Sequence, residues 1–416
     1  MVTVSERGEP AVPRATLRTF PARVAAGYLL QHLGHFGVLP VLAVVLVAQV
    51  PGASPAVVGT ALFGYVGAVG VSCLLVSRWL SRISYVHAMV TGLLLAAAMF
   101  AVLPYVASAP LLIALLLLAG LGTSVNVLLC RAITAHLIPS SADRNRVFSA
   151  QQIAVNIAAA LAPFAALTLV AGGHSRLLFG IVAAFYTAAA VIVRLVLPGR
   201  IRPAPGPGRW PVGRSTVARL LRDRDHRRVL IASAAGSGLY AQFFSAFALL
   251  ISHEVSSAPL RGSYFVANAV IIVLLQVPVS AVVARLLDRG VTPASLLYAG
   301  IALFSVSMVL LGAGIPLVGA AFLAVAIFSV AETIFTPMVS TAFAELPTGS
   351  PIEAFNLRQA CWTVGEAAGS FCGGSIFLVL LNHGGARLYW LSLAACGLAA
   401  VALLALPLRA SVRNEA

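Results

Sequence analysis

The feature that most constrains this chain is a series of long apolar runs, each able to cross a lipid bilayer. A spanning helix needs about 20 predominantly apolar residues, and these runs are rich in Ala and Leu. They lie near residues 20–47, 55–77, 84–107, 110–138, 147–170, 176–197, 229–252, 262–287, 292–313, 316–343, 353–381 and 386–406. Membrane strands would alternate and span only about ten residues. We therefore expect an all-α integral membrane protein with twelve transmembrane helices.

The composition excludes a soluble enzyme. Of the 416 residues, 60% are hydrophobic and only 9% are charged, whereas soluble domains are about 25% charged. The sequence contains no phosphate-binding loop, metal-ligand cluster or catalytic triad. We therefore expect neither enzymatic activity nor a cofactor nor a bound metal.

The net charge is +15, and all 27 basic residues are Arg. The loops after the odd-numbered runs contain only Arg176, Arg261 and Arg387, and nearly all other Arg residues lie in the two tails and the even-numbered loops. Arg concentrates on the cytoplasmic side of membrane proteins. The charge thus indicates topology rather than nucleic-acid binding, and we expect both termini in the cytoplasm. All-Arg usage favours a bacterial inner membrane, and we expect a monomer.

The chain divides at a basic block that runs from Arg200 to Arg228 and contains a Pro/Gly-rich stretch. We interpret this block as a cytoplasmic linker that lies against anionic lipid head groups. The predicted parts are a cytoplasmic N-terminal tail (1–19), a first six-helix bundle (20–197), the linker (198–228), a second six-helix bundle (229–406) and a cytoplasmic C-terminal tail (407–416).

The two bundles share a repeat. Phe148 and Gln152 recur as Phe355 and Gln359, and Arg82 recurs as Arg289, all at an offset of 207 residues. One common offset indicates duplication of a six-helix unit. Such repeats place a substrate site near the bilayer midplane, between the two bundles.

The loop after the eighth run resembles the loop signature G-x-L-A-D-R-x-G-R-R of the major facilitator superfamily. Leu286, Asp288 and Arg289 match it, whereas the first copy keeps Arg82 but has Ser81 in place of the acidic residue. The resemblance covers nearly the whole chain. It implies two pseudo-symmetric six-helix bundles that rock around a central cavity, with Arg82, Asp288 and Arg289 as gating-loop residues.

The chain is most similar to the drug–proton antiporter branch of that superfamily. The branch motif G-x-x-x-G-P-x-x-G-G is matched by Pro163 in the fifth run and by the stretch from Gly365 to Gly374 in the eleventh. Plain helix packing explains such small residues equally well. The branch's Arg in the fourth helix is absent, because Leu116 occupies its position.

Ionisable groups deep in the bilayer are costly and indicate function. At 1.5 Å per residue, Glu332, Glu366, His32 and His35 all lie about 16–22 Å from the cytoplasmic helix ends. These four are the candidates for proton coupling, and a structural hydrogen-bonding role is the alternative for each. Two further ionisable residues, Arg131 and Arg358, lie nearer the cytoplasmic ends and are interpreted as snorkelling anchors.

Polar and aromatic residues at helical spacing mark the faces that would line a cavity. Helix-to-helix hydrogen bonding or plain packing remains the alternative for each. The substrate-cavity candidates are Gln31, Phe36, Asn126, Gln152, Asn156, Tyr240, Phe244, Thr336 and Thr363.

The sequence therefore predicts a secondary active transporter that exports a small organic compound, such as a drug or natural product, by proton antiport. Its partners would be that small molecule, protons and the lipid bilayer. Two alternatives stay open: an importer or facilitator of a small organic solute, and a non-transporting receptor or sensor built on the same fold.

Overall fold

The computed structural model describes residues 14–39, 41–50, 61, 64–70, 75–76, 79–80, 82–197, 201–202 and 212–405. Every regular element in these ranges is helical. Nine helices among them are long and apolar enough to span a membrane, and each coincides with one of the predicted runs. They cover 85–105, 109–137, 141–170, 175–196, 224–251, 260–288, 293–312, 317–344 and 386–405.

Two of the remaining predicted runs are interrupted helices. The first consists of α1 (Arg14–Val38) and α2 (Leu42–Gln49), and α1 ends two residues before Pro40, as expected because proline cannot donate a backbone hydrogen bond. The eleventh consists of α14 (Pro351–Phe371), a π-helical turn (Cys372–Ile376) and α15 (Phe377–Asn382). The second run lies mostly outside the described residues.

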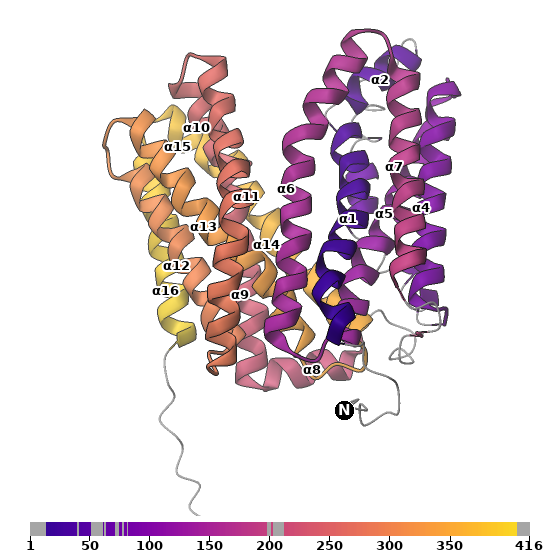
Figure 1. Cartoon of the computed structure of the whole chain (residues 1–416). Helices are drawn as coiled ribbons and strands as arrows, with labels where there is room; N and C mark the ends of the chain where they lie inside the picture. Colours follow the sequence, from indigo (N-terminus) through magenta and orange to yellow (C-terminus); the bar gives the residue numbers. More distant parts are fainter. Residues whose placement is uncertain are drawn as a thin grey trace, which may run out of the picture.

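The helices form two groups that correspond to the two expected bundles (Figure 1). The N-terminal half continues with α4 (Tyr85–Val102), a short 3-10 turn (Leu103–Tyr105), α5 (Ala109–Leu137), α6 (Ser141–Ala171) and α7 (Ser175–Val196). The C-terminal half contains α9 (Arg224–Tyr240), a 3-10 turn (Ala241–Phe243), α10 (Ala246–Glu254), α11 (Ala258–Asp288), α12 (Pro293–Gly312), α13 (Leu317–Ala344), α14, α15 and α16 (Ala386–Ala405). Each half has its own apolar core.

The predicted linker is partly helical, because α8 (Arg214–Arg222) lies within it. Figure 1 shows α8 at the same face as the start of α1 and the end of α16, and we call this the linker face. Several helices begin there behind side-chain caps: Ser140 accepts a hydrogen bond from the backbone N–H of Asp143 (3.3 Å), and Ser350 accepts one from Glu353 (3.2 Å). Such caps satisfy backbone N–H groups that a helix start leaves without partners. The predicted boundaries of the tails and linker stay predictions.

The two halves meet near the linker face, and their ribbons diverge toward the opposite face (Figure 1). In the first turns of α14, Ile352 and Phe355 are buried within the apolar core of the N-terminal half. The start of α14 therefore packs against residues of both halves.

Candidate functional site

The contact between the halves begins at an ion pair next to the linker face. Arg144 at the start of α6 donates to Oε1 of Glu345 at the end of α13 (3.0 Å), and the Ser141 hydroxyl donates to the same oxygen. Arg144 also donates to the backbone carbonyls of Ile138 (3.1 Å) and Pro139 (2.7 Å), which fix the guanidinium within its own half. We call the three side chains Ser141, Arg144 and Glu345 the linker-face clasp.

Beyond the clasp the halves are joined by residues of the predicted repeat. The rings of Phe148 and Phe355 pack edge to face across the interface, with centroids 6.0 Å apart. The amide of Asn145 on α6 donates to the Ser280 hydroxyl on α11 (3.4 Å). Two positions related by the repeat thus touch each other, as positions next to a pseudo-twofold axis do.

Glu332 lies at the innermost of these contacts and is 2% exposed. The Gln152 amide, from the opposite half, donates to its Oε1 (3.2 Å), and the Asn156 amide donates to the Gln152 backbone carbonyl (3.0 Å). The Asn268 amide of α11 lies beside the same carboxyl group. Oε2 nevertheless makes no hydrogen bond of ordinary geometry within the described residues. The structure thus brings together Glu332, Gln152 and Asn156, three of the predicted residues.

The other predicted carboxyl group, Glu366, lies on α14. Its Oε2 accepts a hydrogen bond from Nε1 of Trp362 (2.9 Å), one helical turn earlier. The Arg358 guanidinium lies over the ring of Trp362, 5.2 Å from its centroid, and donates to the Ser340 hydroxyl (3.1 Å). Arg358 is only 3% exposed, so the prediction of a snorkelling anchor was wrong: its head group is enclosed between helices.

An aromatic group separates the two carboxyl groups. Tyr240 on α9 interacts electrostatically with both Glu332 and Glu366. Its ring lies 6.0 Å from Phe328, 5.4 Å from Trp362 and 5.5 Å from Phe244. Phe244 is 57% exposed, so the aromatic group is accessible from outside the protein at Phe244.

Two threonines of the predicted cavity lie on the helices that carry these acids. The Thr363 hydroxyl accepts a hydrogen bond from the Gln359 amide (3.2 Å). The Thr336 hydroxyl is buried and has no hydrogen-bond partner among the described residues.

The predicted residues of α1 and α5 form a separate polar network inside the N-terminal half. Gln31 donates to the Thr123 carbonyl (3.1 Å), and Asn126 donates to Oε1 of Gln31. The Thr123 hydroxyl pairs with the hydroxyl of Tyr186 on α7 (2.8 Å). This chain of bonds ties three helices of one half together.

The network continues to the histidines through residues that the sequence patterns did not single out. Nδ1 of His35 pairs with the Tyr65 hydroxyl (2.8 Å), and Tyr65 is itself hydrogen-bonded to Tyr186. His32 pairs with the Tyr28 carbonyl (2.8 Å), and its ring lies 6.1 Å from that of Phe36. Within the described ranges, no hydrogen bond or ion pair joins either histidine to the two carboxyl groups.

The gating-loop residues Arg82, Asp288 and Arg289 are all exposed. Ser81 lies outside the described residues. In the described part of the chain their side chains form no salt bridge, and the gating role inferred for them stays a prediction. The side chains that bridge the halves at this face belong instead to the linker-face clasp. Sequence reasoning missed the clasp, although Glu345 directly precedes Leu346-Pro347, which recurs as Ile138-Pro139 at an offset of 208 residues.

The glycine-rich motif of α14 lies against α9. A Cβ on Gly365 would collide with the Ala234 carbonyl and the Ser237 hydroxyl, and one on Gly369 would collide with the Gly238 carbonyl. The motif therefore has a packing role in this structure, because the two backbones approach too closely for any larger residue.

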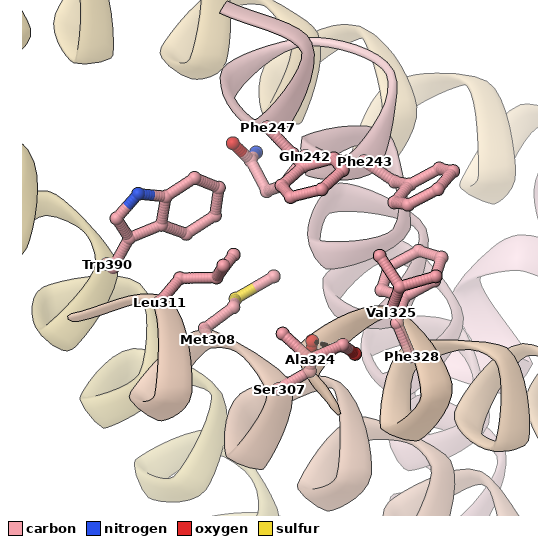
Figure 2. A pocket seen from close by; sticks show the side chains of 10 residues that line it. All are labelled: Gln242, Phe243, Phe247, Ser307, Met308, Leu311, Ala324, Val325, Phe328 and Trp390. Carbon is pink, nitrogen blue, oxygen red and sulfur yellow. Dashed lines mark hydrogen bonds between the residues drawn. The ribbon is translucent and has the colours of Figure 1, made fainter. Parts of the chain in front are cut away.

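Figure 2 shows a pocket inside the C-terminal half, between the 3-10 turn Ala241–Phe243, α10, α12, α13 and α16. Its lining is mostly apolar, and Gln242 bonds the Gly369 carbonyl (2.8 Å) and the Tyr389 hydroxyl (2.7 Å). The Ser307 hydroxyl donates to the Ala324 carbonyl (2.9 Å). The Gln242 amide and the Ser307 hydroxyl are thus satisfied by protein, whereas Nε1 of Trp390 has no hydrogen-bond partner among the described residues.

The described residues contain no group of three or more His, Cys, Asp or Glu side chains placed to hold a metal ion.

Solved structures with the same fold are transporters. The human organic anion transporter MFSD10 (TETRAN) superposes with a TM-score of 0.67 at 19% identity, covering 94% of this chain and 100% of that one. The E. coli fucose:proton symporter FucP gives 0.68 at 16% identity, with 94% and 98% covered. A peptide transporter, POT, gives 0.62 at 15% identity, with 93% and 94% covered. At these identities the likeness shows the fold alone.

No curated protein matches the sequence. The family profile described as "Major Facilitator Superfamily" matches residues 24–351. That match spans more than half of the chain and agrees with the helical fold, so this protein belongs to the Major Facilitator Superfamily, a family of membrane transporters rather than enzymes.

Proposed function

We propose that this protein is a secondary active transporter that exports a small organic compound in exchange for protons, by alternating access between its two halves. The observation that carries the proposal is the contact between Gln152 and Glu332. A buried carboxyl group touches the opposite half at the innermost point of the closed interface, so its protonation state and the separation of the halves are linked.

The proposed cycle uses this link. An ionised Glu332 accepts the amide hydrogen bond from Gln152 strongly, because a charged acceptor strengthens the bond about twofold. Protonation weakens that acceptor and loosens the contact. Glu366, bonded to Trp362, is the second site that could exchange a proton, and the aromatic group around Tyr240 would contact the apolar body of the substrate.

The Arg distribution supports a linker face in the cytoplasm of a bacterial inner membrane. The halves are in contact at this face, so the structure corresponds to a state closed toward the cytoplasm. In an exporter this is the state in which substrate leaves and a proton enters.

The test is transport in proteoliposomes under an imposed proton gradient, with tetraphenylphosphonium, benzoate and a neutral aromatic amide as probes. Wild-type protein should move at least one probe faster with the gradient than without it. Glu332→Gln should abolish the gradient dependence, while Glu254→Gln, at an exposed position, should not. If Glu332→Gln and Glu366→Gln both retain gradient-driven transport, the carboxylates do not carry the proton.

The same assay separates the alternatives. Import or facilitated diffusion predicts net movement in the other direction, or equal movement with and without the gradient. A receptor or sensor predicts binding of a probe without movement. We do not assign His32 or His35 the coupling role, because the described contacts keep them within the N-terminal half.

A further inference from the structure

Two arginines from opposite halves are close enough to interact electrostatically, and both lie between the linker face and the level of Glu332. Arg131 lies on α5 and Arg358 on α14, each about 10 Å from the linker-face end of its helix. They interact electrostatically with each other, and because both are positive this interaction is repulsive. Neither forms a salt bridge within the described residues.

Further polar groups surround the two guanidinium groups. The Tyr28 hydroxyl on α1 interacts electrostatically with both arginines. It is buried, and no hydrogen-bond partner for it exists in the part of the chain that the structure describes. A pocket between the halves is lined by Arg131, Gln359 and Phe355, among others. Donors from both halves, Arg131 and Gln359, therefore reach the same pocket, and Arg358 directly precedes Gln359 on α14.

The balance of charge at this place is positive. The acidic group that acts on Arg358 is Glu366, which already accepts the hydrogen bond from Trp362. The Tyr28 hydroxyl, which has no partner among the described residues, interacts with two guanidinium groups from opposite halves. Arg358 donates to Ser340 through Nε, which leaves its two terminal nitrogens as donors for an oxyanion. Guanidinium groups bind carboxylate and related oxyanions through paired, charge-assisted hydrogen bonds.

We propose that Arg131 and Arg358 together bind the carboxylate or a similar oxyanion group of an organic anion, with Tyr28 as an additional donor. The aromatic rings of Phe355 and Trp362 provide the apolar contacts for the body of that molecule. This assignment names a substrate class for the transporter and rests on the proposed transport function.

The site also gives the substrate a role in closing the linker face. An anion that enters from the linker side can bridge the two arginines, and so pull the halves together. After its release at the opposite face, the two like charges again oppose each other. Their repulsion then favours reopening toward the linker face and resets the transporter.

The experiment measures thermal unfolding of the purified full chain in detergent with sodium benzoate, against benzamide and sodium chloride at equal ionic strength. Benzoate should raise the unfolding temperature and benzamide should not. Arg131→Gln should weaken the apparent benzoate affinity at least tenfold, which is about 1.4 kcal/mol. Arg146→Gln is the matched control, because Arg146 is exposed and paired with Asp143 on α6.

Three results would overturn the proposal: no stabilisation of wild-type protein by benzoate, phenylphosphonate or sulfate; equal stabilisation by benzamide; or unchanged benzoate affinity in Arg131→Gln. Arg131 is half-buried, so its variant remains informative if Arg358→Gln fails to fold. Stabilisation by phosphatidylglycerol alone, lost in Arg131→Gln, would assign the site to a lipid head group and also refute an organic-anion substrate.

The outcome is distinguishable from that of the transport assay. Protein that binds benzoate through Arg131 but moves no probe under a proton gradient would refute the proposed function and leave the anion site intact. Gradient-driven transport that is unaffected by Arg131→Gln would leave the function intact and refute this assignment.

Discussion

Removal of the Glu345 side chain is the most direct test of how the halves are held together. Glu345→Ala deletes the acceptor that joins α13 to both Ser141 and Arg144 of α6. We expect the variant to favour the state that is open at the linker face, because this contact exists only while that face is closed.

The size of the effect follows from the surroundings of the pair. Hydrogen bonds to charged groups contribute about 1.5–3 kcal/mol each, but Glu345 is 36% exposed and solvent screens part of that. Arg144 keeps its bonds to the Ile138 and Pro139 carbonyls in the variant, so it is not left without partners. We therefore expect a loss of about 1–2 kcal/mol, which shifts the ratio of closed to open protein by a factor of about 5–30.

The shift can be measured as a distance distribution between two spin labels. Cysteines placed at His87 on α4 and Arg285 on α11 are suitable, since both positions are exposed near the linker face, in a background without the native cysteines. Electron–electron resonance should show a longer-distance population that grows in Glu345→Ala.

The matched control is Asp143→Asn. It also removes one negative charge at the linker face, but its ion pair with Arg146 (2.7 Å) lies within α6, so it should not alter the distances. If Glu345→Ala leaves the distances unchanged, or if Asp143→Asn shifts them equally, the clasp does not hold the halves together.

Three further variants test the packing within and between the halves. Gly365→Ala should destabilise the protein by about 1–3 kcal/mol, because the added Cβ would meet the backbone of α9. The effect should appear as a lower unfolding temperature. Gly262→Ala should not lower it, since nothing lies within 4 Å of a Cβ at that position. Tyr65→Phe removes the hydroxyl between His35 and α7 and should cost about 1 kcal/mol, whereas the exposed Tyr105→Phe should cost nothing measurable. Glu353→Ala should speed trypsin cleavage of the linker, because the carboxylate accepts hydrogen bonds from the Gly213 N–H in the linker (2.8 Å) and from the Gly349 N–H (2.7 Å). An unchanged cleavage rate would show that the bond to Gly213 does not restrain the linker.

The fold could be predicted from the sequence because the bilayer makes local composition decisive. A helix that spans lipid needs about 20 predominantly apolar residues, so each apolar run predicts one helix, and the 207-residue offset locates the second half. The same offset relates Phe148 to Phe355, and the structure shows that these two rings pack against each other.

The site could be predicted only in part, because polar residues on one helix do not reveal which helix faces them. The stripe on α13 identified Glu332, but its partner Gln152 lies 180 residues earlier. Arg358 was misplaced for the same reason. The short distance from the helix end suggested that the Arg358 guanidinium reaches the boundary between membrane and water. In the structure, Ser340 and Trp362 enclose it instead.

Buried polar groups that lack a hydrogen-bond partner indicate where a ligand can act. In the N-terminal half, His35, Tyr65, Tyr186 and Thr123 form a continuous chain of hydrogen bonds, and such a chain adds rigidity where its members are satisfied. At the closed interface, Oε2 of Glu332 and the hydroxyl of Tyr28 remain buried without hydrogen-bond partners in the described structure. Each such group costs free energy that a bound proton, water or ligand can recover. Of these groups, Tyr28 belongs to the N-terminal half and Glu332 to the C-terminal half, and each interacts with a residue of the other half. A ligand or proton bound at either one can therefore change the balance between the open and closed states.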